Sequence, residues 1–207
     1  MSASDQYRSI AAPAQGLFKD KGSRFIAFAT PVSSEEEIKA ILERTRKEYH
    51  DARHVCFAYR LGLDGGRDSQ QGAVIGKWRL SDDGEPSGTA GRPILGQIDA
   101  AELSDILLVV VRYFGGIKLG VPGLINAYRS AAADALSNAE ICTKTACERL
   151  EAEFPYETLG EVMRLTKGGE VRVEDLQVDT RCRICLSVPL SQVESVRQFP
   201  AFTNVRP

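Results

Sequence analysis

The sequence predicts a two-domain protein of the α/β or α+β class, and three observations lead to this prediction. Strand-like and helix-like patterns alternate along the first part of the 207-residue chain. Residues 106–111 form an unbroken apolar run rich in valine, which is typical of a strand covered on both faces. After Cys142 the order restarts as strand, helix, strand, strand, helix. Because each such order needs its own core, we expect one domain over residues 1–140 and another over residues 141–207.

The first domain is expected to begin with little regular structure, since residues 1–16 are small and polar and form an ordered edge at best. Periodicity then predicts strand 24–32, helix 35–49, strand 54–61, a turn at 64–66, strand 73–80 and helix 94–103. The first helix should begin with a capping box. In it, Ser33 or Ser34 pairs with Glu36 or Glu37.

The strand predicted over residues 106–111 is the structural centre of this domain. Arg112 ends the apolar run, and an unpaired charge is costly in an apolar interior. We therefore expect Arg112 to emerge at the sheet edge where α/β folds form their crevices. The next glycines let the backbone bend or be approached closely, and they are Gly115, Gly116, Gly120 and Gly123. Pro122 suits the first turn of a helix over about residues 123–139.

The second domain is expected to be a split β-α-β module of the ferredoxin-like type. Alternation predicts its first strand over residues 146–154, and an amphipathic pattern predicts a helix over residues 155–167. The remaining elements are strand 170–178, strand 181–189, helix 191–198 and a short last strand, 203–205. The two middle strands contain no aromatic residue, so stacking of RNA bases on this sheet is not expected.

The composition excludes a strongly charged or membrane-embedded class of protein. Lysine and arginine number 26 against 28 aspartate and glutamate, so the net charge of −2 attracts neither RNA nor an anionic membrane. No stretch approaches the roughly 18 apolar residues of a membrane span, and no signal-like segment is recognisable. Five cysteines without a dense framework are expected to be reduced thiols, which indicates a cytoplasmic protein.

The loop after the third strand is the first candidate functional segment. Asp82, Asp83 and Glu85 lie close together among glycines and prolines. Carboxylates so close repel one another unless a cation lies between them. The partner is a hard metal ion such as Mg²⁺, or Arg53 or Arg112 from neighbouring strand ends, or water.

Three further features each have a functional and a structural interpretation. The free N–H groups of residues 88–91, including Thr89, open a helix and are able to accept an anion. His54 is a candidate for proton transfer, since an imidazole in general titrates near neutral pH, but a hydrogen-bonded structural histidine has the same pattern. The glycines after the central strand resemble a phosphate cradle yet fit neither common nucleotide-binding pattern, and tight strand-to-helix packing explains them equally.

The sequence contains none of the common catalytic motifs. A Gly-x-Ser-x-Gly elbow, a His-Glu-x-x-His pair and a kinase signature are all absent. Cys182 and Cys185 have the spacing of a metal or redox motif, but residues three apart on a strand point to opposite faces. Zinc is therefore disfavoured, and binding is favoured over catalysis.

Four separated segments together resemble a known family. They are Lys21-Gly-Ser-Arg-Phe-Ile26, Asp51-Ala-Arg-His-Val-Cys56, Ser81-Asp-Asp-Gly-Glu-Pro-Ser-Gly-Thr-Ala-Gly91 and Val109-Val-Val-Arg-Tyr-Phe-Gly-Gly-Ile-Lys-Leu-Gly120. In this order, across about residues 17–136, they resemble the IMPACT family in its bacterial YigZ-like branch. The resemblance implies a ribosomal protein S5 domain 2-like amino-terminal domain and a ferredoxin-like carboxyl-terminal domain similar to the last domain of translocating elongation factors.

The resemblance also implies a role in translation. Eukaryotic relatives regulate translation under amino-acid stress by competing for an activator of an initiation-factor kinase, and they carry an additional RWD domain. We therefore predict a cytoplasmic regulatory or accessory protein, not an enzyme, that binds RNA, the ribosome or a translation factor without a cofactor. The alternative is a metal-dependent phosphate-ester hydrolase or nucleotide-binding enzyme that uses Mg²⁺ on the Asp82, Asp83 and Glu85 loop.

The predicted binding patch combines strand-end charges, the acidic loop and the glycine-rich turn. It consists of Arg24, Arg53, His54, Asp82, Asp83, Glu85, Thr89, Arg112, Tyr113, Gly115 and Gly116. Strand-end charges and an acidic glycine loop contribute little to packing, so we expect the charged members to converge on one concave surface. The sequence does not specify the oligomeric state.

Overall fold

The computed structural model describes residues 5–62 and 76–206, and in it the chain divides into two compact units. Arg8–Lys144 is one unit, and Thr145–Pro207 forms the other together with the segment before Arg8. The sequence had assigned that first segment to the amino-terminal domain. In the structure the Asp5 carboxylate accepts hydrogen bonds from the N–H and the hydroxyl of Ser191, at 3.0 and 2.5 Å. These hydrogen bonds join the segment to the carboxyl-terminal unit.

The unit Arg8–Lys144 contains a five-stranded sheet in the order β2-β3-β6-β4-β5. Its strands are β2 (Ala14–Asp20), β3 (Ser23–Pro31), β6 (Ile106–Tyr113), β4 (His54–Leu61) and β5 (Lys77–Ser81). Every neighbouring pair is antiparallel, so the sheet lacks the shared carboxyl edge at which open α/β sheets form their crevices. The reason is that β6 inserts between β3 and β4 and runs opposite to both. The mixed helix and strand class is confirmed.

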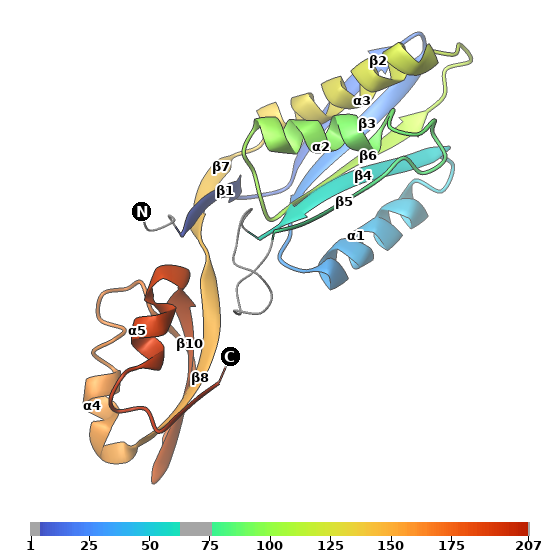
Figure 1. Ribbon diagram of the computed structural model, residues 1–207. Helices are drawn as coiled ribbons and strands as arrows, with labels where there is room; N and C mark the ends of the chain where they lie inside the picture. The colour runs from blue at the N-terminus through green and yellow to red at the C-terminus, as the bar shows by residue number, and fades with distance from the viewer. Residues whose placement is uncertain (1–4, 63–75, 207) are drawn as a thin grey trace. The chain divides into compact units, whose positions relative to one another are not determined.

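Helices cover both faces of this sheet (Figure 1). Helix α1 (Glu35–Glu48) lies on one face, and α2 (Gly91–Ala100) and α3 (Gly120–Ser137) lie on the other. Strand β6 accordingly contributes alternate residues to two cores, with Leu107, Val109 and Val111 on the α1 side and Ile106, Leu108 and Val110 on the other. The predicted double burial of this strand is confirmed. Each such side chain stabilises the fold by roughly 1.5–3 kcal/mol.

The capping box at the start of α1 is also confirmed. Ser34 is the N-cap, and its Oγ accepts a hydrogen bond from the Glu37 N–H at 3.1 Å. The Glu37 carboxylate in turn accepts from the Ser33 N–H at 2.8 Å. One donor of the first helical turn and one donor just before the N-cap are thereby satisfied.

Three strands of the structure are not predicted by the sequence. Two of them, β1 (Gln6–Ile10) and β7 (Ile141–Thr145), form a separate two-stranded sheet, and the third is β2. Gly16 makes β2 resemble a loop, but it serves close packing, since a Cβ there would lie 2.2 Å from the Ala135 backbone nitrogen. The predicted turn at 64–66 and the start of the strand predicted over 73–80 lie outside the described residues.

The carboxyl-terminal unit is a four-stranded antiparallel sheet with short helices. Its strands are β8 (Cys147–Pro155), β9 (Arg172–Gln177), β10 (Arg181–Pro189) and β11 (Asn204–Arg206), in the order β11-β8-β10-β9. The helix predicted over 155–167 is much shorter. It is a 3-10 turn (Tyr156–Thr158) followed by α4 (Leu159–Val162), because irregular turns follow Val162 up to Gly169 with its φ of 76°.

The last helix of this unit is α5 (Val193–Arg197), which follows a 3-10 turn (Leu190–Gln192). Its Val196 joins Leu150, Phe154 and Leu186 in a separate apolar core. Across the part of the chain that the structure describes, no helix combines the length and the apolar character needed to cross a membrane.

Candidate functional site

A groove of about 410 Å³ lies in the amino-terminal unit, between the β5–α2 loop, the start of β4 and the β6–α3 turn. Its lining comprises Arg53, His54, Glu85, Pro86, Arg112, Phe114, Lys118, Leu119, Gly120, Val121 and Leu124. Four residues of the predicted patch therefore meet here, namely Arg53, His54, Glu85 and Arg112. The other seven lie outside this lining.

A buried ion pair forms the floor of the groove. An Nη1–H of Arg112 donates to the Glu85 carboxylate, and both residues are more than nine-tenths buried. The Tyr128 hydroxyl donates to the same Glu85 oxygen at 2.8 Å, and His54 Nε2 lies 3.9 Å from it. Arg112 lies near the end of β6 and lines the groove, but its side chain is buried and does not emerge into solvent. Glu85, from a distant loop, neutralises its charge, which is the arginine alternative predicted for the acidic loop.

The Arg112 guanidinium is not fully satisfied by this pair. Its Nε is the one buried side-chain nitrogen or oxygen within residues 5–62 and 76–206 that lacks a hydrogen-bond partner. The guanidinium carbon lies 5.5 Å from the ring centroid of Phe25 and 5.7 Å from that of Phe114. Arg112 is therefore held by one carboxylate and two aromatic faces and retains an unused donor.

Asp82 caps the start of α2 with its side chain. Its carboxylate accepts three backbone hydrogen bonds, from Gly88 at 2.8 Å, Ala90 at 2.9 Å and Gly91 at 2.8 Å. Burial alone would raise the pKa of Asp82, but these three donors outweigh it and hold the pKa below its ordinary value. The N–H groups expected to accept an outside anion are thus already engaged. Thr89 is buried as well, and its hydroxyl donates to the Pro86 carbonyl.

We expect Asp82→Ala to lower the free energy of unfolding by about 2 kcal/mol, because the start of α2 loses its acceptor. Chemical denaturation followed by circular dichroism measures the effect. Ser87→Ala changes an exposed residue of the same loop and serves as the control. Equal unfolding midpoints for the two variants would show that Asp82 does not cap the helix.

The lowered pKa of Asp82 also predicts a pH dependence. A carboxylate whose pKa is lower in the folded state stabilises the fold fully above its unfolded pKa, and this stabilisation is lost as the pH falls through the folded pKa. We therefore expect the stability gap between the wild type and Asp82→Asn to shrink below about pH 4. Denaturation curves measured from neutral to acid pH check this, and a constant gap would contradict it.

Asp83 belongs to a different set of contacts. Its carboxylate accepts the Val55 N–H at 2.8 Å and pairs with Arg46 at 3.0 Å, while its carbonyl lies 2.7 Å from His54 Nδ1. The carbonyl can only accept, so we assign the Nδ1 proton to His54. The three carboxylates of the acidic loop therefore face separate partners. Within residues 5–62 and 76–206 no three His, Cys, Asp or Glu residues are arranged to hold a metal ion.

The glycine-rich turn is explained by packing. A Cβ at Gly115 would lie 2.0 Å from the Gly22 carbonyl carbon, and the Gly115 N–H donates to the Ser23 hydroxyl at 3.1 Å. Gly116 has a φ of 90° and faces open space. Gly115 thus packs the turn against the β2–β3 hairpin, Gly116 supplies a left-handed backbone conformation, and neither lines the groove.

The last two patch residues, Arg24 and Tyr113, pair with each other on neighbouring strands. The Arg24 guanidinium lies 4.9 Å from the Tyr113 ring centroid, and the Tyr113 hydroxyl donates to the Asp51 carboxylate at 2.8 Å. Neither residue lines the groove. Four residues of the predicted patch therefore line one groove, and the other seven lie outside its lining.

Sequence reasoning missed the apolar part of the groove. Phe114, Lys118, Leu119 and Val121 line it, and the apolar side chains of the turn are unusually exposed, at 45% for Phe114 and 51% for Val121. The signal was available, because large apolar residues among glycines in a turn have no core to enter.

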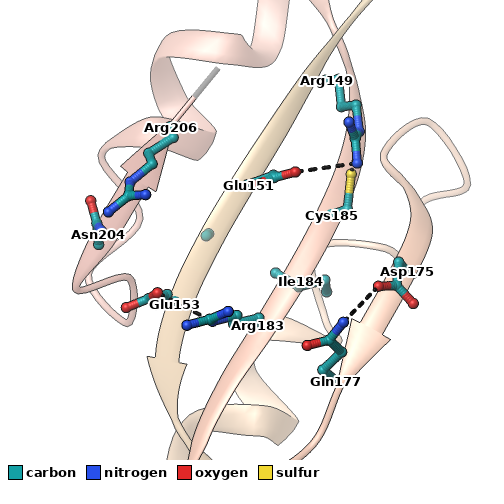
Figure 2. Close-up of a pocket in the computed structure, with 11 residues that line it drawn as sticks. Arg149, Glu151, Glu153, Asp175, Gln177, Arg183, Ile184, Cys185, Asn204 and Arg206 are labelled. Carbon is teal, nitrogen blue, oxygen red and sulfur yellow. Dashed lines mark hydrogen bonds and ion pairs between the residues drawn. The ribbon is translucent and has the colours of Figure 1, made fainter.

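A second hollow, of about 280 Å³, lies on the sheet of the carboxyl-terminal unit. Figure 2 shows its charged side chains on β8, β9, β10 and β11. Arg149 pairs with Glu151 at 3.2 Å, and Arg183 pairs with Glu153 at 3.3 Å. Its lining contains no aromatic ring, and its charges are largely paired with one another. We therefore regard the first groove as the candidate site.

The cysteines behave as the strand geometry predicts. Cys182 lies in the core of the carboxyl-terminal unit, whereas Cys185 lies on the hollowed face, where the Arg149 Nε–H donates to its sulfur at 2.8 Å. The two thiols thus point to opposite faces of the sheet, and the prediction is confirmed. In the other unit, burial raises the pKa of Cys56 to about 12, so this thiol stays protonated at neutral pH.

Comparison with known proteins places the groove within a matched domain. The model of the Impact N-terminal domain matches residues 21–136, which include the whole lining of the groove. The chain belongs to the IMPACT family. Family member YigZ of Escherichia coli is 37% identical over 178 residues, covering 85% of this chain and 83% of YigZ. The predicted bacterial branch of the IMPACT family is thereby confirmed.

Two further relatives show how far the IMPACT likeness extends. The Protein IMPACT homolog of Saccharomyces cerevisiae is 36% identical over 103 residues, which are 49% of this chain and 36% of the yeast protein. A crystal structure of a hypothetical protein is 33% identical with a TM-score of 0.70, covering 92% of this chain and 88% of that chain. The bacterial and structural matches span both units, whereas the yeast match spans about half of this chain.

Proposed function

We propose that this IMPACT family protein is a cytoplasmic, translation-associated regulatory or accessory protein that acts by binding RNA, the ribosome or a translation factor. Family membership supports the link to translation, because the family resemblance implies that role for eukaryotic members. The observation that supports a binding function is which groups of the groove already have partners and which remain exposed. Its one carboxylate, Glu85, is already engaged by Arg112 and Tyr128, whereas its exposed groups are cationic or apolar.

The topology supports the two domain types that the resemblance implies. In the carboxyl-terminal unit the chain order β8, β9, β10, β11 becomes the spatial order β11-β8-β10-β9, in which the fourth strand lies beside the first. This is the arrangement of a ferredoxin-like split β-α-β fold. We assign the amino-terminal unit to the ribosomal protein S5 domain 2-like type, because its helix-linked strands β3 and β4 flank the inserted strand β6.

The engaged carboxylates also explain why we do not favour the enzyme alternative. A magnesium-dependent hydrolase on this loop requires carboxylate oxygens free to bind the metal. Asp82 instead accepts three backbone N–H groups, and Asp83 pairs with Arg46 and with the Val55 N–H. The same contacts occupy the amides that were expected to hold a phosphate.

Sedimentation with ribosomes at low and physiological salt tests the proposal. We expect the full chain to pellet with ribosomes, and Arg53→Glu or Lys118→Glu to weaken binding about tenfold, because each reverses an exposed charge at the groove. Lys39→Glu makes the same change on exposed α1 and should bind like the wild type. A chain that stays in the supernatant at both salt concentrations, with no RNA or translation factor co-purifying, would refute the translation role.

A further inference from the structure

We infer that the groove binds an acidic, apolar segment of a partner protein, in which carboxylate side chains alternate with bulky aliphatic or aromatic ones. The inference rests on the proposed function, since it names the chemistry of the partner that the same site recognises. Three independent features of the groove support it: its exposed apolar rim, the sign of its charges and the unused donor on its floor.

The rim of the groove exposes large apolar side chains. Phe114 and Val121 are about half exposed, Leu119 lies between them in the chain, and Ile117 of the same turn is 57% exposed. Scattered apolar residues on a surface are ordinary, but several gathered in one turn mark an interaction site. A partner that covers this rim must present apolar side chains of its own.

The charges of the groove determine the sign of the charge that a partner must carry. Arg53 and Lys118 are exposed, and within residues 5–62 and 76–206 neither pairs with a carboxylate. His54 adds a third basic side chain. Glu85, the one carboxylate of the lining, is neutralised by Arg112. The surface left to a ligand is therefore cationic, and its complement is an anion.

Arg112 provides the third feature that indicates a ligand. It is 7% exposed, it lines the groove, and its Nε–H has no acceptor. Buried donors without acceptors are rare in folded proteins, and each calls for an explanation. A carboxylate seated against the floor would approach a guanidinium, whose forked donors match carboxylate geometry. Because the Arg112 side chain lines the groove, its incompletely satisfied guanidinium favours a carboxylate beside the apolar rim.

A protein segment fits these features better than RNA does. Affinity for RNA grows with the number of phosphates neutralised, and the groove presents Arg53 and Lys118 as its exposed cationic side chains. Phe114 is the one phenylalanine, tyrosine or tryptophan of the lining, and the Arg112 guanidinium already lies over its ring. Protein interfaces have an apolar centre with few charges, whereas nucleic-acid interfaces are polar and strongly positive.

Affinity selection from three peptide libraries of equal length tests the inference on the immobilised full chain. One library alternates Asp or Glu with Leu, Ile, Val or Phe. The second replaces the acids by Lys or Arg, and the third replaces the apolar residues by Ser or Asn. We expect enrichment from the first library alone. No enrichment from it, or equal enrichment from all three, overturns the inference.

Variants then locate the binding of a selected, fluorescein-labelled peptide, measured by anisotropy. Lys118→Glu and Val121→Ser should each raise the Kd about tenfold, because both remove groups that contact the segment. Lys39→Glu and Leu17→Ser make matched changes at exposed positions outside the groove and should leave the Kd within about twofold. All four side chains are exposed, so the variants should fold, as circular dichroism melting curves verify.

Competition with an oligouridine RNA decides between the two kinds of macromolecule. If the RNA displaces the peptide and binds more tightly, the groove is an RNA site and the inference fails. Ribosome sedimentation keeps the two proposals separate. Sedimentation without peptide selection overturns this inference alone. Peptide selection without sedimentation, and without a co-purifying RNA or translation factor, overturns the translation role alone.

Discussion

Glu85→Ala is expected to lower the free energy of unfolding by about 3–5 kcal/mol, because it leaves the Arg112 guanidinium buried without its counter-charge. The Tyr128 hydroxyl loses its acceptor in the same step. Typical domains are stable by only about 5–15 kcal/mol, so the loss removes a large part of the total. Urea denaturation followed by circular dichroism measures it.

Two companion variants isolate the cause. Glu43→Ala removes an exposed glutamate of α1 and should change stability by no more than about 0.5 kcal/mol. The double variant Glu85→Leu/Arg112→Met removes both buried charges and should be more stable than Glu85→Ala, since apolar side chains of similar size often replace a buried pair. If the double variant is no more stable than Glu85→Ala, the unpaired guanidinium is not the source of the loss.

Local signals in the sequence were sufficient for the elements that local chemistry determines. The apolar run of β6 predicts burial on both faces, and the structure divides its side chains between two cores. The serines and glutamates before α1 predict its first turn, because a capping box joins residues only a few positions apart. Such features depend on neighbours in the chain, so periodicity and spacing reveal them.

These local signals do not determine the direction of a strand and do not reveal the edge strands. Periodicity does not say that β6 inserts between β3 and β4, and this insertion makes every pairing of the five-stranded sheet antiparallel. Strand β2 was missed because its Gly16 is typical of a loop. The glycine instead allows the backbone of α3 to approach closely at Ala135, which lies 119 residues later in the chain.

The candidate site shows the same limit. The sequence correctly indicated that the three carboxylates needed partners, but it left a metal ion, an arginine and water open. The choice depends on distances across the fold, since Arg112 lies 27 residues from Glu85 and Tyr128 lies 43 residues from it. Asp82 was assigned to a binding role because the pattern that caps a helix and the pattern that surrounds a ligand use the same residue types.

Gly115→Ala is the second variant with a large expected effect, a loss of about 3 kcal/mol, because the added methyl group overlaps fixed atoms. Its Cβ would lie 2.0 Å from the Gly22 carbonyl carbon and 2.2 Å from the Ser23 nitrogen. Both are backbone atoms, so no side-chain rotation relieves the contact. The β6–α3 turn must move away from the β2–β3 hairpin, and the hydrogen bond to the Ser23 hydroxyl is strained with it.

The matched control for this variant is expected to change the free energy of unfolding in the opposite direction. Gly96 lies exposed within α2, and a Cβ there meets no atom within 4 Å, so Gly96→Ala should stabilise the fold by about 0.5–1 kcal/mol. Urea denaturation of the two variants in parallel gives both values. Because the turn that Gly115 anchors also carries Phe114 and Lys118, Gly115→Ala should weaken peptide binding at the groove as well. Unchanged stability in Gly115→Ala would mean that the turn is not packed against the hairpin and that its glycines need another explanation.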